Sequence, residues 1–253
     1  MADTRHHRGP HPEDSGDFAS AHVPALRLAV HDHSWLLSHN YGPASALKLV
    51  GDHFNLSGRQ RLAVMRSSCS DLAREQRFAR LTAPISGARL LIDGYNVLTT
   101  IEAALAGGVL LIGRDGCMRD LASMHGSWRK VEETAAAIRL IGRELEVSGI
   151  GDVRWLLDSP VSNSGRLRGE ILRAAAEHGW SWQADLVLSP DKLLGESAEL
   201  IATADSAILD RPVRWINLAR TVVEHHIPGA WIIDLSHSPQ APARESPPAS
   251  AGS

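Results

Sequence analysis

The stretch "GARLLIDGYNVLTT", residues 87–100, decides how the rest of the sequence is interpreted. Its first half is a continuous apolar run, which is typical of a strand buried on both faces of a parallel sheet. The run ends at Asp93, and a glycine, a tyrosine and Asn96 follow directly. Gly94 lets the backbone approach a neighbour closely, and the Asn96 amide can orient a carboxylate or a phosphate. The stretch therefore predicts a buried strand that opens onto a polar site.

Short apolar runs alternate with helical segments from residue 88 onward. Continuous apolar runs of about four to six residues between helices indicate a parallel sheet that is covered on both faces. The runs are "ARLLID", "GGVLLIG", "VRWLLD", "SWQADLVLS", "ELIATAD", "VRWIN" and "AWIID". The sequence therefore predicts a three-layer, Rossmann-like α/β domain with a mostly parallel sheet.

A small all-helical unit is predicted before this domain. Helical spacing of apolar residues covers residues 21–80, and Ser57 stands where a helix N-cap is expected. We place a linker at residues 81–87, which contain proline and glycine, and the α/β domain at residues 88–235. The polar residues 1–20 and the Pro/Ser/Ala-rich residues 236–253 are predicted to be a disordered arm and a disordered tail.

Composition and charge narrow the class of protein. The chain has 253 residues, of which 43% are hydrophobic and 22% charged, and its net charge of −3 argues against a uniformly basic coat for nucleic acid. No apolar run reaches the roughly 20 residues of a spanning helix, and residues 1–20 lack the apolar core of a secretory signal. The two cysteines have no ligand-like spacing. These features predict a cytoplasmic protein without a membrane partner, and they leave the oligomeric state, a dimer included, open.

Three further carboxylates stand where apolar runs end. Asp158 ends "VRWLLD", Asp205 ends "ELIATAD", and Asp115 comes just after "GGVLLIG". Because ligands of open α/β sheets bind at the carboxyl ends of the strands, we expect these groups to converge with Asp93 on one edge. Crowded carboxylates repel one another unless a cation neutralises them, and oxygen ligands suit Mg²⁺ or Mn²⁺. The alternative is that each aspartate only starts a turn or caps a helix.

Two motifs carry a resemblance to a known family. "LLIDGYNVL" resembles the first strand of the NYN branch of PIN-like nucleases, and "LIATADSAI" resembles a late strand of that family, which ends in a Thr/Ser-x-Asp turn. The resemblance covers roughly residues 88–235 and implies hydrolysis of RNA with Mg²⁺ or Mn²⁺. It also implies Asp93 and Asp205 as metal ligands, Asn96 as an orienting amide and Thr203 as a supporting hydroxyl. The whole chain resembles a little-characterised bacterial and archaeal family with an N-terminal helical segment, which implies no activity.

PIN-like domains usually supply a further acidic residue after the first strand. The candidates here are Asp115, Asp120, Glu132 and Glu133, and their spacing does not choose between them.

Groups that suit phosphate follow Asp158 in "VRWLLDSPVSNSG". Ser162, Asn163 and Ser164 bring hydroxyls and an amide to the start of a predicted helix, where free N–H groups favour anions, and Arg166 follows. The alternative is simple capping of that helix. The basic segment "GRDGCMRDLASMHGSWRK" adds Arg129 as a possible phosphate contact and His125 as a less favoured general acid.

The predicted function is a metal-dependent nuclease, for which RNA is favoured as the substrate and DNA stays open. One alternative is a non-catalytic module that binds nucleic acid with the same fold, and another is a small-molecule phosphohydrolase. The first strand is followed by neither Asp-x-Asp nor GxGxxG, which haloacid-dehalogenase and dinucleotide-binding sites need. The helical unit has the length and the glycine-bearing turn of a helix-turn-helix, with Arg59, Arg61 and Arg66 on its second helix as candidate phosphate contacts, and the favoured alternative is generic helical packing.

Overall fold

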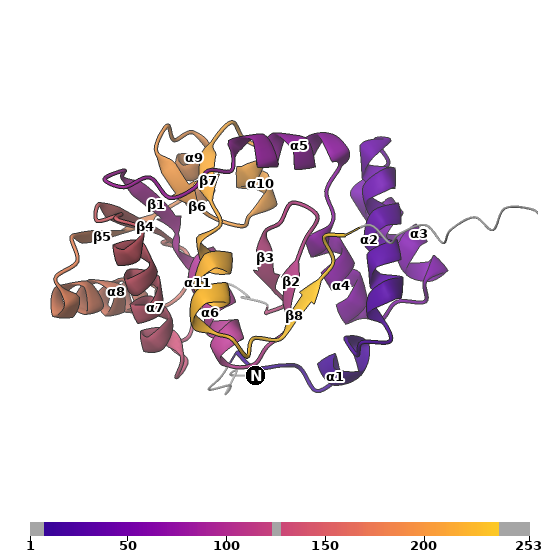
Figure 1. Cartoon of the computed structure of the whole chain (residues 1–253), viewed down its shortest axis with the longest axis horizontal. Coiled ribbons are helices and arrows are strands. Elements are labelled where there is room, and N and C mark those ends of the chain that lie inside the picture. The colour runs from indigo at the N-terminus through magenta and orange to yellow at the C-terminus, as the bar shows by residue number, and fades with distance from the viewer. Residues whose placement is uncertain (1–7, 123–127, 238–253) are drawn as a thin grey trace, which may run out of the picture.

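A computed structural model describes residues 8–122 and 128–237 (Figure 1). Its centre is a five-stranded parallel sheet in the order β5-β4-β1-β6-β7, with β1 in the middle. The strands are β1 Leu90–Asp93, β4 Val153–Asp158, β5 Trp182–Val187, β6 Leu200–Ala202 and β7 Arg214–Ile216. The predicted α/β class with a mostly parallel central sheet and a Rossmann-like layout is confirmed.

Helices cover both faces of this sheet (Figure 1). Leu90 and Ile92 of β1 point into a core built with one group of helices, whereas Leu91 points into a second core on the other face. The first group is α6 Gly94–Leu105, α7 Thr134–Val147, α8 Ser164–His178 and α11 Leu218–His226. The other face is covered by α9 Pro190–Gly195 and α10 Ser206–Leu209. Both faces being buried explains why the strands read as continuous apolar runs.

Two of the predicted strands belong to a separate three-stranded sheet, in the order β3-β2-β8. β2 Leu110–Ile112 pairs antiparallel with β3 Met118–Asp120 and parallel with β8 Ile232–Asp234. The expectation that "GGVLLIG" joins the same sheet as "ARLLID" is therefore wrong. A buried apolar run has the same composition in either sheet, so its sequence does not reveal its partner strand.

The N-terminal helices pack on this second sheet (Figure 1). The helices that share its core are α2 Val23–Ser38, α3 Pro43–His53 and α4 Gly58–Ser67, and the last N-terminal helix, α5 Asp71–Arg80, contacts α2. Leu26 and Val64 share a core with Leu111 and Ile233. Ser57 caps α4 through a capping box with Gln60, as its position before that helix predicts. Within the described residues, the helices are too short or too polar to cross a membrane.

The arginines of α4, which is the second helix of the predicted helix-turn-helix, have partners within the protein. Arg59 binds Asp14, Arg61 binds Asp52, and Arg66 donates to the carbonyl oxygens of Asp120 and Ala122. Since these guanidinium groups hold the fold together, they are not available as a phosphate track, and the helix-turn-helix interpretation loses its contacts.

Part of the predicted disordered arm is ordered. Residues 8–20 include α1 Asp14–Asp17, and Phe18 is buried in the core of the helical unit. Asp14 is itself buried and accepts two hydrogen bonds from Arg59, at 2.7 and 2.8 Å. Burial of an aromatic ring and a satisfied carboxylate offset the entropy of ordering a polar segment. Residues 1–7 and 238–253 lie outside the described residues.

The linker at residues 81–87 begins as an extension of the main sheet. Leu81 pairs with Trp215 of β7 in a parallel bridge, and the Thr82 amide donates to the Trp215 carbonyl at 3.0 Å. The connection is therefore held against the sheet edge at its start.

Candidate functional site

Carboxylates gather at the carboxyl ends of adjacent strands. Asp93 ends β1, Asp158 ends the neighbouring β4, and Asp205 follows β6 on the other side of β1 after a short turn. Because side chains alternate along a strand, Asp93 lies on the face of Leu91 and Asp158 on the face of Leu156, which is the same face. The chain runs from β1 to β4 and β5 on one side and returns to β6 on the other. Such a reversal at the carboxyl ends is where open α/β sheets bind ligands.

Asp93 is the buried member of the group, with 9% of its surface exposed. The Thr203 hydroxyl donates to its Oδ2 atom at 2.7 Å. Burial raises the pKa of Asp93 to about 7; the Thr203 bond lowers that pKa, whereas the charges of Asp205 and Asp191 raise it further. Asp93 is therefore a carboxyl group that exchanges its proton near neutral pH, which an exposed aspartate does not do.

Asn96 organises the turn that carries Asp205. Its Oδ1 atom accepts from the Ala204 amide at 2.7 Å, and the Asp205 amide donates to the Thr203 hydroxyl at 3.0 Å. Asp205 in turn caps α10 by accepting from the Ala207 amide at 2.7 Å. Thr203 thus touches Asp93 with its hydroxyl hydrogen and holds the Asp205 amide with its oxygen.

Gly94 is required by close packing at the start of α6. A Cβ atom at this position would lie 2.4 Å from Leu157 Cδ2 and 3.0 Å from the Leu156 carbonyl oxygen. The absence of a side chain lets the first turn of α6, directly after Asp93, rest against β4.

Asp191 is a site residue that the sequence reasoning missed. It lies exposed in the first turn of α9, and its pKa is raised by partial burial and by the charges of Asp205 and Asp158. Its own charge acts on Asp93. The signal was present, because "SWQADLVLS" is a strand whose end is followed at once by Pro190 and Asp191. We call Asp93, Asp158, Asp191 and Asp205 the acidic rim.

Asp158 faces partly inward. Its Oδ1 atom is buried and has no hydrogen-bond partner among the described residues. Burial raises the pKa of Tyr95 to about 12, and the negative charge of Asp158 adds to this increase. An unsatisfied buried carboxylate oxygen carries a desolvation cost that a cation or a donor on a ligand would relieve.

Asp115 lies outside the acidic rim, which corrects its expected place. Its carboxylate accepts from Arg77 at 2.6 Å and from both ends of the Arg119 guanidinium at 2.7 and 2.9 Å. Burial would raise the pKa of Asp115, but the charges and hydrogen bonds of Arg119 and Arg77 hold it well below its ordinary value. A carboxylate saturated by two arginines is not free to hold a metal. The error follows from assigning β2 to the main sheet.

The other three candidates for the further acidic residue stay predictions, and the structure shows some of their partners. Asp120 accepts from the Thr100 hydroxyl at 2.9 Å and from the Ala122 amide at 2.8 Å. Glu132 and Glu133 precede α7, where Glu133 adds to the effect of burial in raising the pKa of Glu102. None of the three contributes to the raised pKa of Asp93.

The predicted phosphate contacts lie around the start of α8, close in sequence to Asp158. Asn163 has a left-handed backbone, with φ 67°, and its amide donates to the Trp128 carbonyl at 3.0 Å. Ser164 is buried, whereas Ser162 and Arg166 are exposed. Arg129 is half-buried, and its carbonyl accepts from Arg8 at 3.5 Å. His125 lies outside the described residues.

The donor set of the acidic rim fits a hydrated Mg²⁺ or Mn²⁺ rather than a closed cage. Among the described residues, no three His, Cys, Asp or Glu side chains are close enough together to surround a metal ion. Mg²⁺ is commonly held by one or two carboxylates, with waters and substrate phosphates completing its shell. The oxygen-only rim and the unpartnered Asp158 oxygen suit that mode of binding.

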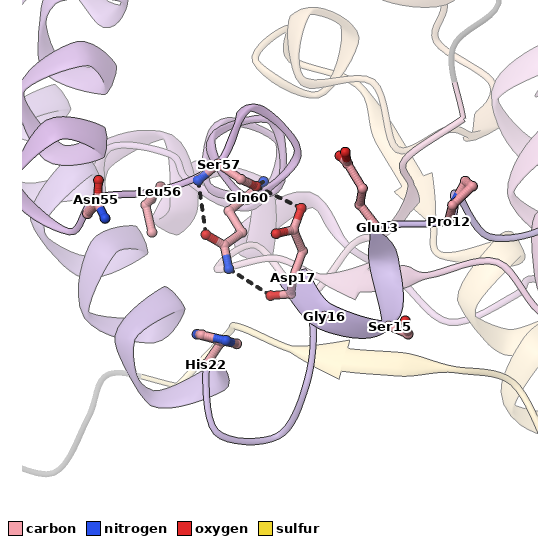
Figure 2. Close-up of a pocket in the computed structure, with 10 residues that line it drawn as sticks. All are labelled: Pro12, Glu13, Ser15, Gly16, Asp17, His22, Asn55, Leu56, Ser57 and Gln60. Atoms are coloured by element: carbon pink, nitrogen blue, oxygen red, sulfur yellow. Dashed lines mark hydrogen bonds between the residues drawn. The ribbon is translucent and has the colours of Figure 1, made fainter.

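A depression of about 700 Å³ lies elsewhere, between residues 12–22 and the start of α4 (Figure 2). Figure 2 shows that its polar groups bind one another: the Ser57 hydroxyl donates to Asp17 at 2.7 Å, and Gln60 donates to the Asp17 carbonyl at 2.7 Å. These contacts fix the first residues onto α4, and no residue of the acidic rim lines the depression.

Comparison with known proteins places the chain in a family. The chain belongs to the family described as "Domain of unknown function (DUF5616)", which matches residues 82–221. Residues 25–80 match "Protein of unknown function (DUF434)". The chain is similar to "Uncharacterized protein MJ0935" of Methanocaldococcus jannaschii, at 29% identity over 187 residues that cover 73% of this chain and 89% of the relative. No solved structure matches the chain. The predicted relation to a family of unknown function is confirmed, and the finer resemblance to PIN-like nucleases stays a prediction.

Proposed function

We propose that the acidic rim is the active site of a metal-dependent nuclease that hydrolyses phosphodiester bonds of RNA. The observation that carries this proposal is that four aspartates lie at the carboxyl ends of β1 and β4, after β6 and at the start of α9, where the charges of Asp205 and Asp191 act on the buried Asp93. The charges of Asp205 and Asp158 also act on Asp191. The choice of RNA rests on the resemblance of "LLIDGYNVL" and "LIATADSAI" to NYN domains.

The residues of the rim have separate tasks in this proposal. Asp93 and Asp191 hold Mg²⁺ or Mn²⁺, and Thr203 fixes the Asp93 carboxylate through its hydroxyl. Asn96 holds Asp205 in place through the Ala204 amide. When bound, the metal supplies activation of water and stabilisation of the leaving oxygen. Ser162 and Arg166, exposed at the start of α8, are placed to contact a neighbouring phosphate, since helix N-termini and arginine favour anions.

A cleavage assay with matched variants tests the proposal. Single-stranded and structured RNA are incubated with the purified protein and Mn²⁺ or Mg²⁺. Asp93→Asn keeps the side-chain shape and removes the charge, so it should lower the cleavage rate by at least about a hundredfold while RNA binding survives. Asp152→Asn is the control, because Asp152 precedes β4 at the opposite end of the sheet and pairs with Arg89 on the surface.

The outcomes distinguish cleavage at the acidic rim from cleavage at another site or by a contaminating nuclease. Full-rate cleavage by Asp93→Asn would place the chemistry elsewhere, and equal loss in both variants would indicate a general defect. A parent protein that binds RNA and cleaves none of the panel with either metal would support a non-catalytic module instead.

A further inference from the structure

A buried cluster of charges lies beside the acidic rim and takes no part in the chemistry proposed above. Arg77 of α5 donates to Asp115 at 2.6 Å and, through two nitrogens, to Asp210 at 2.7 and 2.8 Å. Arg119 of β3 donates hydrogen bonds to both carboxylate oxygens of the same Asp115. Arg77 and Asp115 are 3% and 1% exposed, so the cluster is an internal structure rather than a surface pair. We call Arg77, Asp115, Arg119 and Asp210 the arginine cluster.

The arginine cluster joins three parts of the molecule. Arg77 comes from the N-terminal helices, Asp115 and Arg119 come from the second sheet, and Asp210 follows α10 on the main sheet. The Trp215 indole also donates to the Arg77 carbonyl at 2.9 Å, which anchors α5 to β7. A displacement of α5 would therefore also displace residues of the main sheet.

The cluster contacts the backbone that carries Asp205. Arg119 Nε donates to the Ala204 carbonyl at 2.8 Å, and Arg77 Nη2 donates to the Ser206 carbonyl at 3.4 Å. The Ala204 amide is held by Asn96 from the opposite side. Backbone groups of Ala204 and Ser206, the residues before and after Asp205, are thus bound by side chains from α6, β3 and α5.

We propose that Arg77 and Arg119 are positioning residues that set the place of Asp205 in the acidic rim, so that the N-terminal helices control the geometry of the site through α5. The catalytic meaning of this inference rests on the proposed function, but the mechanical link does not. Neither arginine touches substrate. Each binds one carbonyl oxygen and at least one carboxylate at once, which needs the planar fork of a guanidinium, and a lysine ammonium cannot reproduce it.

The experiment compares Arg77→Lys with Arg59→Lys in the full chain. Arg59 is the matched control, because it also binds a buried aspartate through two nitrogens and contacts a carbonyl, that of Leu121, but does not touch residues 203–206. Hydrogen exchange is followed for the amides of residues 203–207, and Mn²⁺ affinity is measured by calorimetry. Arg77→Lys should speed exchange of the Ala204 and Asp205 amides at least tenfold and weaken Mn²⁺ binding several-fold. Arg59→Lys should leave both within twofold of the parent.

Equal exchange at residues 203–207 in the two variants would overturn the inference, because a general loss of stability would then explain both. If Arg77→Lys fails to fold, Asp210→Asn is measured in the same way, since it removes an exposed partner of Arg77 and leaves Asp115 in place. Unchanged exchange in Asp210→Asn would likewise contradict it. A parent protein that binds no Mn²⁺ would contradict the proposed function alone, and the exchange result would still decide the mechanical link.

Discussion

Asp93 gives the acidic rim a measurable pH dependence. Its folded-state pKa, about 7, lies above the ordinary value of 3.8 mainly because of burial, so the folded protein holds a proton there that the unfolded chain has released. The parent without metal therefore loses stability as the pH rises from about 4 to about 7, and the loss is complete above that range. At lower pH, where both states are protonated, this contribution vanishes.

Asp93→Asn removes that loss. In the presence of a chelator, denaturant melts at pH 4.5 and at pH 8 compare the unfolding free energies of the variant and the parent. The difference in favour of the variant should be about 2–4 kcal/mol larger at pH 8 than at pH 4.5. A difference between variant and parent that does not change with pH would mean that Asp93 is not the buried, proton-holding group.

A second prediction at the scale of one residue concerns Gly94. Gly94→Ala forces a methyl group against Leu157 and the Leu156 carbonyl, at 2.4 and 3.0 Å, so it should destabilise the fold by about 1–3 kcal/mol. Gly165→Ala in the first turn of α8 meets no atom within 4 Å and should be neutral or slightly stabilising. Equal unfolding free energies for the two variants would show that the start of α6 does not pack on β4 as described.

Single residues at the rim could be predicted from the sequence to different degrees. Asp93 and Asp158 end apolar runs, so their place at the carboxyl edge follows from strand polarity alone. The hydroxyl of Thr203 came only from the resemblance to NYN domains. Asp191 lies in the helix that follows a strand, so a rule limited to the last residue of each strand misses it, although the strand before it could be recognised.

At the scale of elements, Asp115, which the sequence predicts to be a metal ligand, belongs to the arginine cluster. Asp115→Asn leaves Arg77 and Arg119 buried without their shared carboxylate, so it should cost about 3–5 kcal/mol of unfolding free energy. Asp71→Asn, which breaks the exposed pair with Arg114, should cost no more than about 1 kcal/mol. Chemical denaturation of both variants checks this, and a similar small cost for each would mean that Asp115 is solvated rather than internal.

The order of the strands and their division into two sheets could not be predicted from the sequence. Periodicity and apolar content identify β2 and β8 as strands, and both are. Their sheet is decided by contacts with Leu26 and Val64 of the N-terminal helices, which are far away in sequence. Long-range packing of this kind leaves no mark in a three-residue strand.

At the scale of the whole molecule, the N-terminal helices and the main sheet are joined by shared structure. The two family matches meet between residues 80 and 82, yet the helices share a core with β2 and β8, and α5 reaches the rim through Arg77. The boundary in the sequence is thus bridged by packing in three dimensions. Pro and Gly near residue 84 mark a change of local structure, and they carry no information about these contacts.

The central claim is that the acidic rim binds a divalent metal, and a crystal structure with Mn²⁺ tests it most directly. An anomalous difference map should show a peak at the carboxyl end of β1, about 2.2 Å from an Asp93 oxygen and within reach of Asp191 or Asp205 directly or through water. Crystals of Asp93→Asn prepared in the same way should lack the peak. A map of the parent at saturating Mn²⁺ with no peak at the rim, or with its peak at other residues, would contradict the account.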